Sequence, residues 1–150
     1  MRLEDEIKQS KDFKSEYHKL AVNIFYTYGW LVEIHAEVFR DYDITMQQYN
    51  ILRILRGQYP EPATVNLLKE RMLDKMSDVS RLVERLRLKG LLERKICPND
   101  RRRAEIKITK DGMALLNKLD SLDFEINQSL QNISEKEAKK VNELLDKLRG

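Results

Sequence analysis

Residues 79–112 decide the fold, and they read VSRLVERLRLKGLLERKICPNDRRRAEIKITKDG. Apolar side chains first recur at three- and four-residue steps, at Val79, Leu82, Val83 and Leu86. This period predicts an amphipathic helix, and Gly90 suits the position just past its end. After Gly90 the apolar period changes from 3.6 to 2, which predicts strands over residues 92–97 and 104–108. The stretch therefore predicts a helix followed by a β-hairpin.

Two shorter helices are predicted upstream of this one. Thr45 followed by Gln48 is a capping box, which predicts a helix of about ten residues that ends near Gly57. Thr64 caps the next, short helix, and a turn around residues 74–75 leads into the helix described above. A short helix, a tight turn and a second helix make a helix-turn-helix.

The polar side of the second helix suits insertion into a DNA major groove. Short side chains near its start let the helix approach the bases, and arginines one and two turns later reach phosphates or guanine edges. Three further arginines are predicted in a turn-rich hairpin tip, residues 97–103, where guanidinium groups fit the narrow minor groove. The candidate DNA-contacting residues are Thr64, Ser77, Asp78, Ser80, Arg81, Arg85, Lys95, Arg101, Arg102 and Arg103.

Long helices are predicted on both sides of this lobe. Residues 11–42 carry two apolar stripes along about 45 Å of helix, and a helix after Thr109 carries a stripe over residues 113–133, about 35 Å long. Ser134 and Glu137 form a capping box that begins a terminal helix. Such overhanging apolar faces predict a homodimer. The candidate interface residues are Phe13, Tyr17, Leu20, Ile126, Leu130, Val141, Leu145 and Leu148.

Composition supports a mainly α fold with a small β-hairpin. Hydrophobic residues make up 41% of the chain and charged ones 35%, and five glycines with three prolines provide few turns for an all-β fold. The longest uncharged stretch, residues 20–32, is shorter than the roughly 20 residues of a membrane helix. The acidic N-terminus lacks the apolar region of a signal peptide, and the single Cys97 cannot close an intrachain disulfide. We therefore expect a cytoplasmic protein without membrane contact.

The net charge of +3 is unevenly distributed. Residues 69–110 carry 14 Lys/Arg against 7 Asp/Glu, a balance of +7, and the rest carries 14 against 18, a balance of −4. A basic centre between acidic flanks is the pattern expected when the middle of a chain meets a polyanion. Ordinary solvated helix faces give the same pattern, so charge alone does not decide between these interpretations.

Residues 67–112 resemble the MarR family of winged-helix regulators. The matching segments, in order, are VSRLVERL (79–86), KGLLER (89–94), DRRR (100–103) and ITKDG (108–112). Upstream, ITMQQY (44–49) is similar to the start of the family's second helix. Four such segments in order and at the right spacing make the resemblance specific.

The resemblance implies a single domain over residues 1–150, with a winged-helix DNA-binding lobe at 44–110 and dimerisation helices at 1–43 and 111–150. It implies a homodimer on a palindromic operator in double-stranded DNA, acting most often as a repressor, and associated with the nucleoid when bound. It also assigns three residues: Asp100 braces the wing, Arg102 enters the minor groove, and Arg81 lies on the recognition helix.

Three residues depart from the family pattern. Asp43 stands where the family usually has glycine, so that turn is expected to differ in shape. Lys75 replaces a small N-cap residue, which leaves Asp74 or Ser77 as the expected cap. Asp78 either complements the helix N-terminus or accepts a hydrogen bond from a cytosine amine.

The family resemblance commonly implies a small-molecule pocket between the dimer helices and the DNA-binding lobe. We expect it where the first long helix, the helix after Thr45 and the helix after Thr109 converge, for a small aromatic or amphipathic effector. The candidate lining residues are Tyr26, Trp30, His35, Tyr49 and Met113, with Tyr28 nearby. The alternative is that these rings fill the core.

No catalytic motif is present in the sequence, so we expect neither an enzyme nor a bound cofactor or metal. His18 and His35 are about 25 Å apart on one helix and cannot share a metal within one chain. Cys97 is either a small wing residue or a thiol whose pKa its basic neighbours lower. The competing function is a winged-helix docking module for other proteins, which would not need this many arginines on one side.

Overall fold

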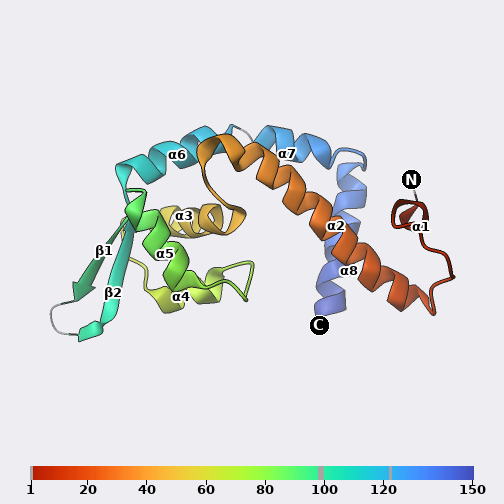
Figure 1. The fold of residues 1–150 in the computed structure, drawn as a ribbon, viewed down its shortest axis with the longest axis horizontal. Coiled ribbons are helices and arrows are strands. Elements are labelled where there is room, and N and C mark those ends of the chain that lie inside the picture. Colours follow the sequence, from red (N-terminus) through yellow and green to blue (C-terminus); the bar gives the residue numbers. More distant parts are fainter. Residues whose placement is uncertain (1, 98–99, 122) are drawn as a thin grey trace.

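The chain folds as a mainly helical protein with one antiparallel β-hairpin (Figure 1). The computed structural model describes residues 2–97, 100–121 and 123–150, with all their side chains except those of residues 97, 100–103 and 123–125. The elements are α1 (Leu3–Glu6), α2 (Glu16–Phe39), the 3₁₀ helix η1 (Arg40–Tyr42), α3 (Met46–Gln58), α4 (Val65–Arg71), α5 (Val79–Leu88), β1 (Leu92–Cys97), β2 (Asp100–Ile108), α6 (Lys110–Asp120), α7 (Asp123–Ser129) and α8 (Glu135–Arg149). The fold class predicted from the sequence is therefore confirmed.

A winged-helix lobe forms at one end of the molecule, where α3, α4, α5 and the hairpin pack together (Figure 1). Ala63 forms an isolated β-bridge with β2: its backbone N–H donates to the Ile106 carbonyl at 2.9 Å, and its carbonyl accepts from the Ile106 N–H at 2.8 Å. The largest fully buried side chains are Phe39, Ile51, Leu52, Leu55, Leu68, Met72, Leu86, Leu92, Ile106, Leu116, Leu119 and Val79. Most of them belong to this lobe, and Phe39 of α2 and Leu116 and Leu119 of α6 complete its core.

The predicted helix starts are confirmed by their caps. Thr45 and Gln48 form the capping box of α3, and the Thr64 hydroxyl accepts a hydrogen bond from the Leu67 N–H at 3.2 Å. The Thr109 hydroxyl accepts from the Gly112 N–H and donates to the Gly90 carbonyl at 2.7 Å. This second bond fastens the start of α6 to the end of α5.

The long helices differ from their predicted bounds. The first begins at Glu16 rather than near residue 11, since the Ser15 hydroxyl caps it by accepting from the His18 N–H. A separate short helix, α1, precedes it and is joined to it by the Glu4–Lys19 ion pair. Beyond Phe39 the backbone tightens into η1 instead of continuing as α-helix.

The predicted continuous helix over residues 113–133 is wrong, because the structure divides it into α6 and α7. Ser121 is the C-cap residue of α6, and its hydroxyl donates a hydrogen bond to the Lys118 carbonyl at 2.6 Å. Serine side chains that bond nearby backbone carbonyls compete with helix continuation. After α7, Ser134 and Glu137 begin α8 with the predicted capping box.

The turn at Asp43 keeps a conformation that glycine usually provides. Its backbone is left-handed, with φ 48° and ψ 44°, which aspartate tolerates better than most residues. Lys89, at the end of α5, holds this turn: its Nζ donates to the Asp43 carbonyl and lies 2.9 Å from the Asp43 carboxylate. The predicted difference in turn shape from the family stays a prediction.

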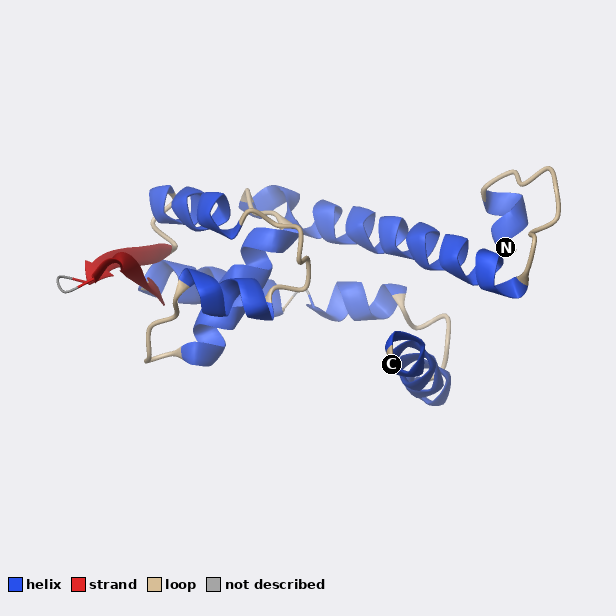
Figure 2. Ribbon diagram, turned by 90° about the horizontal axis from the view of Figure 1, so that it is seen from below, coloured by secondary structure: helices blue, strands red, loops and turns tan. Residues whose placement is uncertain are grey.

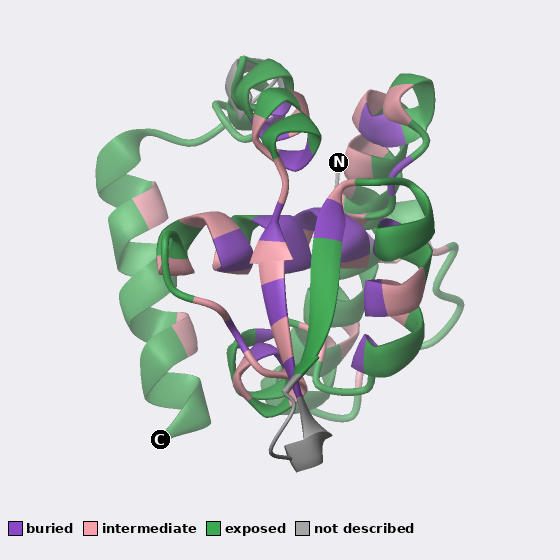
Figure 3. Cartoon of the chain, turned by 90° about the vertical axis from the view of Figure 1, so that its left-hand side faces the viewer, coloured by how far each residue is buried: buried purple, intermediate pink, exposed green. Residues whose placement is uncertain are grey.

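Outside the lobe, α2, α7 and α8 project away from it (Figure 2), and apolar side chains such as Phe25 on α2 and Leu144 on α8 are exposed. In Figure 3, α8 is exposed along nearly its whole length, with a few half-buried positions. In the described part of the chain, no helix is long and apolar enough to cross a membrane.

Candidate nucleic-acid interface

Helix α5 presents a polar face to solvent and an apolar face to the core. Val79, Val83 and Leu86 are buried, whereas Ser80, Arg81 and Arg85 are exposed. The Asp78 carboxylate caps the helix by accepting a hydrogen bond from the Arg81 N–H at 3.1 Å. Small and basic side chains thus lie together on the accessible side of the helix, as a major-groove reader requires.

The N-cap of α5 is Asp78, so the expectation of Asp74 or Ser77 is wrong. Asp74 instead organises the preceding turn, accepting from the Met76 N–H at 2.9 Å and from the Ser77 hydroxyl at 3.0 Å. These hydrogen bonds hold the pKa of Asp74 below its usual value, and the bond from the Met76 N–H has the largest effect. Of the two roles considered for Asp78, the structure shows the helix-capping one, and Ser77 is half-buried by its bond to Asp74.

Thr64 and Lys95 belong to the elements before and after α5 in the chain, α4 and β1. Thr64 is half-buried and its hydroxyl is used in the cap of α4. Lys95 is exposed on β1, with its Nζ 3.7 Å from the Glu93 carboxylate, a distance at which an exposed pair contributes little stability. Its ammonium group therefore remains accessible to a phosphate.

The three arginines of the wing lie in a strand rather than in a turn. Strand β2 begins at Asp100, so the predicted loop over residues 97–103 is too long. The register shifts next to them: Ile96 pairs with Ala104, and Cys97 pairs with Asp100. The side chains of Cys97, Asp100, Arg101, Arg102 and Arg103 lie outside the described residues, so their predicted roles remain predictions.

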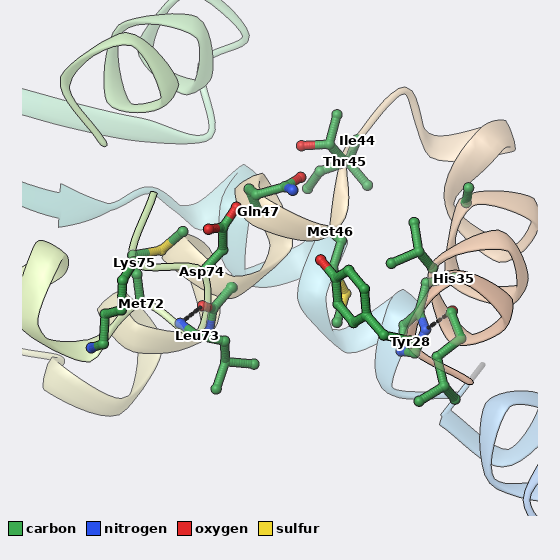
Figure 4. Close-up of a pocket in the computed structure, with 14 residues that line it drawn as sticks. Tyr28, His35, Ile44, Thr45, Met46, Gln47, Met72, Leu73, Asp74 and Lys75 are labelled. Carbon is green, nitrogen blue, oxygen red and sulfur yellow. Dashed lines mark hydrogen bonds between the residues drawn. The ribbon is translucent and has the colours of Figure 1, made fainter. Parts of the chain in front are cut away.

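A pocket of about 560 Å³ opens between α2, the start of α3 and the segment that joins α4 to α5 (Figure 4). Tyr28 and His35 line it from α2, and Leu73, Asp74 and Lys75 line it from the joining segment. The Nδ1 atom of His35 lies 2.6 Å from the Leu31 carbonyl oxygen. Since a carbonyl only accepts, this Nδ1 carries a proton and donates it.

Of the five predicted lining residues, all of them described, only His35 lines this pocket. Tyr49 is buried, with its ring 4.8 Å from that of Phe39, and Met113 packs against the core. Burial and the neighbouring Glu6 carboxylate raise the pKa of Tyr26, which places Tyr26 beside α1. Trp30 is partly exposed elsewhere on α2. For Tyr49 and Met113, the core interpretation was the correct one.

The predicted dimer residues are largely exposed in the single chain. Tyr17 is 84% exposed and Leu148 53%, and Leu20, Leu130 and Val141 are exposed as well, whereas Phe13 and Leu145 are half-buried. Ile126 differs, because it is buried within the chain where α7 packs against α2. A groove of about 820 Å³ runs between α2 and α8, lined by Leu20, Ile24, Leu31, Leu144 and other apolar residues.

Two ion pairs that sequence reasoning missed join the lobe to the flanking helices. Arg56 on α3 contacts Asp120 at the end of α6 through two bonds of 2.6 and 3.0 Å. The second pair is the Lys89–Asp43 contact between α5 and the end of η1. Arg56 and Asp120 are 64 positions apart, so no local pattern in the sequence could have indicated their contact.

Comparison with known proteins agrees with this geometry. The sequence model of the MarR family matches residues 42–103, which include α3, α4, α5 and β1. A MarR transcription factor from Planctomyces limnophilus is 28% identical, with a TM-score of 0.71 over 92% of this chain and 98% of that one. Residues 42–103 thus form a MarR-family winged-helix domain.

Two further solved structures bear on the site. The C80S mutant of Escherichia coli MarR, solved in complex with operator DNA, is 26% identical, with a TM-score of 0.80 over 92% of this chain and 99% of that one. Bordetella bronchiseptica BpsR, whose DNA binding is regulated by 6-hydroxynicotinic acid, is 24% identical, with a TM-score of 0.79 over 88% of this chain and 99% of that one. These likenesses show that the chain has the fold of a MarR-family transcription regulator.

Proposed function

We propose that this protein is a homodimeric, sequence-specific DNA-binding regulator that acts as a repressor in the cytoplasm. The observation that carries the proposal is the exposed row of Ser80, Arg81 and Arg85 on α5, beside a wing whose sequence holds three consecutive arginines. The bound state of Escherichia coli MarR on operator DNA supports the same use of this fold. Residues 44–110 would bind DNA, and residues 1–43 and 111–150 would hold the dimer together.

In this proposal, α5 enters the major groove and the wing enters the minor groove. Arg81 would contact a base edge or a phosphate, while Ser80 allows close approach near the helix start. Thr64 and Lys95 would contact the backbone, together with Arg101 and Arg103, and Arg102 would enter the minor groove with Asp100 bracing the wing. Asp78 and Ser77 would act by shaping the start of α5.

The dimer is proposed from the uncovered apolar faces of α2 and α8. A groove of 820 Å³ between them is too large for side chains of one chain to fill, and a second copy would cover it. We expect an interface well above about 2,000 Å², as in obligate homodimers. A two-fold axis would then place the two α5 helices on successive turns of DNA.

An effector is proposed for the pocket between α2, α3 and residues 72–75. Its volume lies within the roughly 300–1,000 Å³ typical of ligand sites, and its wall is mostly apolar with a few polar groups such as Tyr28, His35 and Asn50. Residues 72–75 lead directly into α5, so a bound small molecule would shift that helix relative to α2. Regulation of BpsR by 6-hydroxynicotinic acid supports a pocket of this kind.

The test of DNA binding is a salt titration with random duplex DNA. A regulator that neutralises phosphates with Lys and Arg loses affinity steeply as salt rises, because bound counterions are released. A docking module for other proteins would bind the duplex weakly, with no steep salt dependence.

For the effector, the test is a titration with small phenols and aromatic acids, read from the His35 ring signals by NMR and from DNA affinity in the same samples. Ala36→Trp, which fills the pocket, serves as the control. A ligand that moves the His35 signals without changing DNA affinity would show a pocket that does not regulate.

A further inference from the structure

A second cleft lies between the end of α2 and η1, the start of α3 and the end of α5. Its volume is about 560 Å³, and none of its wall belongs to the α4–α5 segment that lines the proposed effector pocket. Phe39, Ile44 and Leu88 give it an apolar side, and Arg40, Arg85 and Lys89 give it a basic one. The cleft therefore joins the dimerisation helix to the recognition helix.

The charges of this cleft are unbalanced. Its wall holds three cations, Arg40, Arg85 and Lys89, against one carboxylate, Asp43. Lys89 is paired with Asp43 at 2.9 Å, and the nearest carboxylate to Arg40 is that of Glu37, at 3.9 Å. Arg85 forms no ion pair with any residue that the structure describes. An excess of positive charge thus faces a partly enclosed space.

Polar groups of α3 add to this attraction. Gln48 is only 3% exposed, and its Oε1 accepts from the Thr45 N–H at 3.1 Å. Within the described part of the chain, no hydrogen bond uses the Gln48 amide nitrogen, although Gln48 forms part of the cleft wall. The N-terminal end of α3 also lies here, and the positive end of a 13-residue helix favours an anion.

We infer that this cleft binds a small organic anion, a carboxylate or a phosphate monoester that carries a short apolar group. The oxyanion would lie among Arg40, Lys89 and the Gln48 amide, since charge-assisted bonds to guanidinium and ammonium groups are the strongest available there. The apolar group would lie against Ile44 and Leu88. Uncharged ligands would leave the cations without a partner and would bind poorly.

A DNA phosphate fits this cleft less well than a small molecule. In helix-turn-helix complexes the N-terminal residues of the recognition helix contact the bases. Lys89 lies at the opposite end of α5, about 15 Å along the helix from Val79. Arg40, the first residue of η1, lines the cleft together with Leu88 and Lys89 at this end of α5.

Binding would also change how α5 is held. The incoming anion competes with the Asp43 carboxylate for Lys89, and this pair fastens the end of α5 to the turn after η1. Only this regulatory consequence rests on the proposed DNA-binding function. The binding itself is a property of the cleft and is measured without DNA.

The experiment titrates the full chain with hexanoate, hexyl phosphate and the uncharged control hexanamide. NMR follows the side-chain NH₂ signals of Gln48 and the backbone N–H of Lys89. We expect both anions to shift these signals saturably and hexanamide to leave them in place. Preference for one anion identifies a carboxylate or a phosphate as the natural group. If neither anion shifts the Gln48 signals, or if hexanamide shifts them equally, the inference is wrong.

Variants distinguish a specific anion-binding site from non-specific electrostatic attraction. Arg40→Gln and Lys89→Met should each weaken anion binding about tenfold, the loss expected for one charge-assisted bond. Asp43→Asn should strengthen binding, because it removes the competing carboxylate while asparagine keeps the left-handed turn. Lys118→Gln, an exposed cation on α6, is the matched control and should change nothing.

Equal affinity in all four variants would show non-specific attraction and would overturn the inference. A different failure would appear if Arg40→Gln lowered the affinity for random duplex DNA while the anions did not bind. The cleft would then be a DNA-phosphate contact, and the proposed DNA-binding function would stand without it.

Discussion

The winged-helix lobe and the flanking helices α2 and α8 differ in whether the chain buries their apolar side chains. In the lobe, Leu52, Leu68 and Leu86 are completely buried by neighbours from the same chain. On α8, Leu144 and Leu148 are 57% and 53% exposed, although they lie on one apolar stripe. The lobe therefore has a complete core, whereas the flanking helices have an apolar surface that needs a partner.

This difference separates two kinds of amphipathic helix that look alike in sequence. Helices α5 and α8 both carry apolar residues at helical spacing. The apolar face of α5 meets α3 and β1, while that of α8 faces a groove open to solvent. Stability should thus be a property of the single chain in the lobe and of the assembly in the flanking helices.

The largest expected effect comes from truncating a buried side chain in the core of the lobe. Leu52→Ala should lower the free energy of unfolding by about 2–5 kcal/mol, because Leu52 is fully buried and its loss leaves a cavity. Urea unfolding measures this loss, which should be independent of protein concentration. The comparison variant Leu144→Ala should instead lower the midpoint more at low protein concentration than at high, since it weakens association. Equal, concentration-independent losses in both variants would remove the distinction between the regions.

Charges on the α8 stripe should break the dimer without unfolding the lobe. The double change Leu145→Glu and Leu148→Glu would bury two unpaired carboxylates in the interface, raising the dimer dissociation constant about 100-fold or more. Sedimentation velocity at micromolar concentration should show monomers, and circular dichroism should retain the helices of the lobe. A stable dimer in this variant would mean that another surface mediates assembly.

Within the lobe, the exposed face of α5 should matter for DNA and not for stability. Arg81→Ala should weaken binding to a selected operator by about 1–3 kcal/mol, through a lost base-edge or phosphate contact. Arg87→Ala is the matched control, because Arg87 pairs with Glu84 at 2.7 Å on the same helix. Fluorescence anisotropy with labelled DNA measures both. Equal affinities for wild type and Arg81→Ala would remove Arg81 from the contact face.

The smallest effect concerns the Arg56–Asp120 ion pair, which joins the two regions. The Arg56 guanidinium holds the pKa of Asp120 below its ordinary value of 3.8. A lowered folded-state pKa stabilises the fold above the ordinary value, and this stabilisation is lost as the pH falls through the folded-state pKa. Both groups are partly exposed, so Asp120→Asn should cost less than about 1 kcal/mol at pH 7. Urea unfolding from pH 7 to pH 2.5 should show the free energies of unfolding of the wild type and of Asp120→Asn converging. A difference that stays constant with pH would contradict a stabilising Arg56–Asp120 ion pair.

Local patterns predicted much of the lobe, because its elements are defined by residues close in sequence. The caps at Thr45, Thr64 and Thr109 and the change of period after Gly90 placed three helix starts and the first strand correctly, whereas the second strand begins four residues earlier than predicted. The break between α6 and α7 was missed, since the apolar stripe continues across it and only a serine side chain marks it.

The pocket was predicted less well, for a physical reason. An aromatic ring in a helix can face either the core or a cavity, and spacing alone does not distinguish them. Tyr49 faces Phe39 and Tyr26 lies beside α1, and of the five expected residues only His35 lines the pocket. The residues that do line the pocket include Asp74 and Lys75, which local analysis treated as a turn and, for Asp74, as a candidate helix cap.

The most direct test of the central claim is a selection of binding sites from random duplex DNA by the intact protein. If α5 reads the major groove in a two-fold dimer, the selected sequences should converge on a palindrome whose half-site centres lie about 10 base pairs apart. Arg81→Ala carried through the same selection should lose preference at one position in each half-site. Selected pools with no shared sequence, or with a single unpaired half-site, would contradict a homodimeric, sequence-specific regulator.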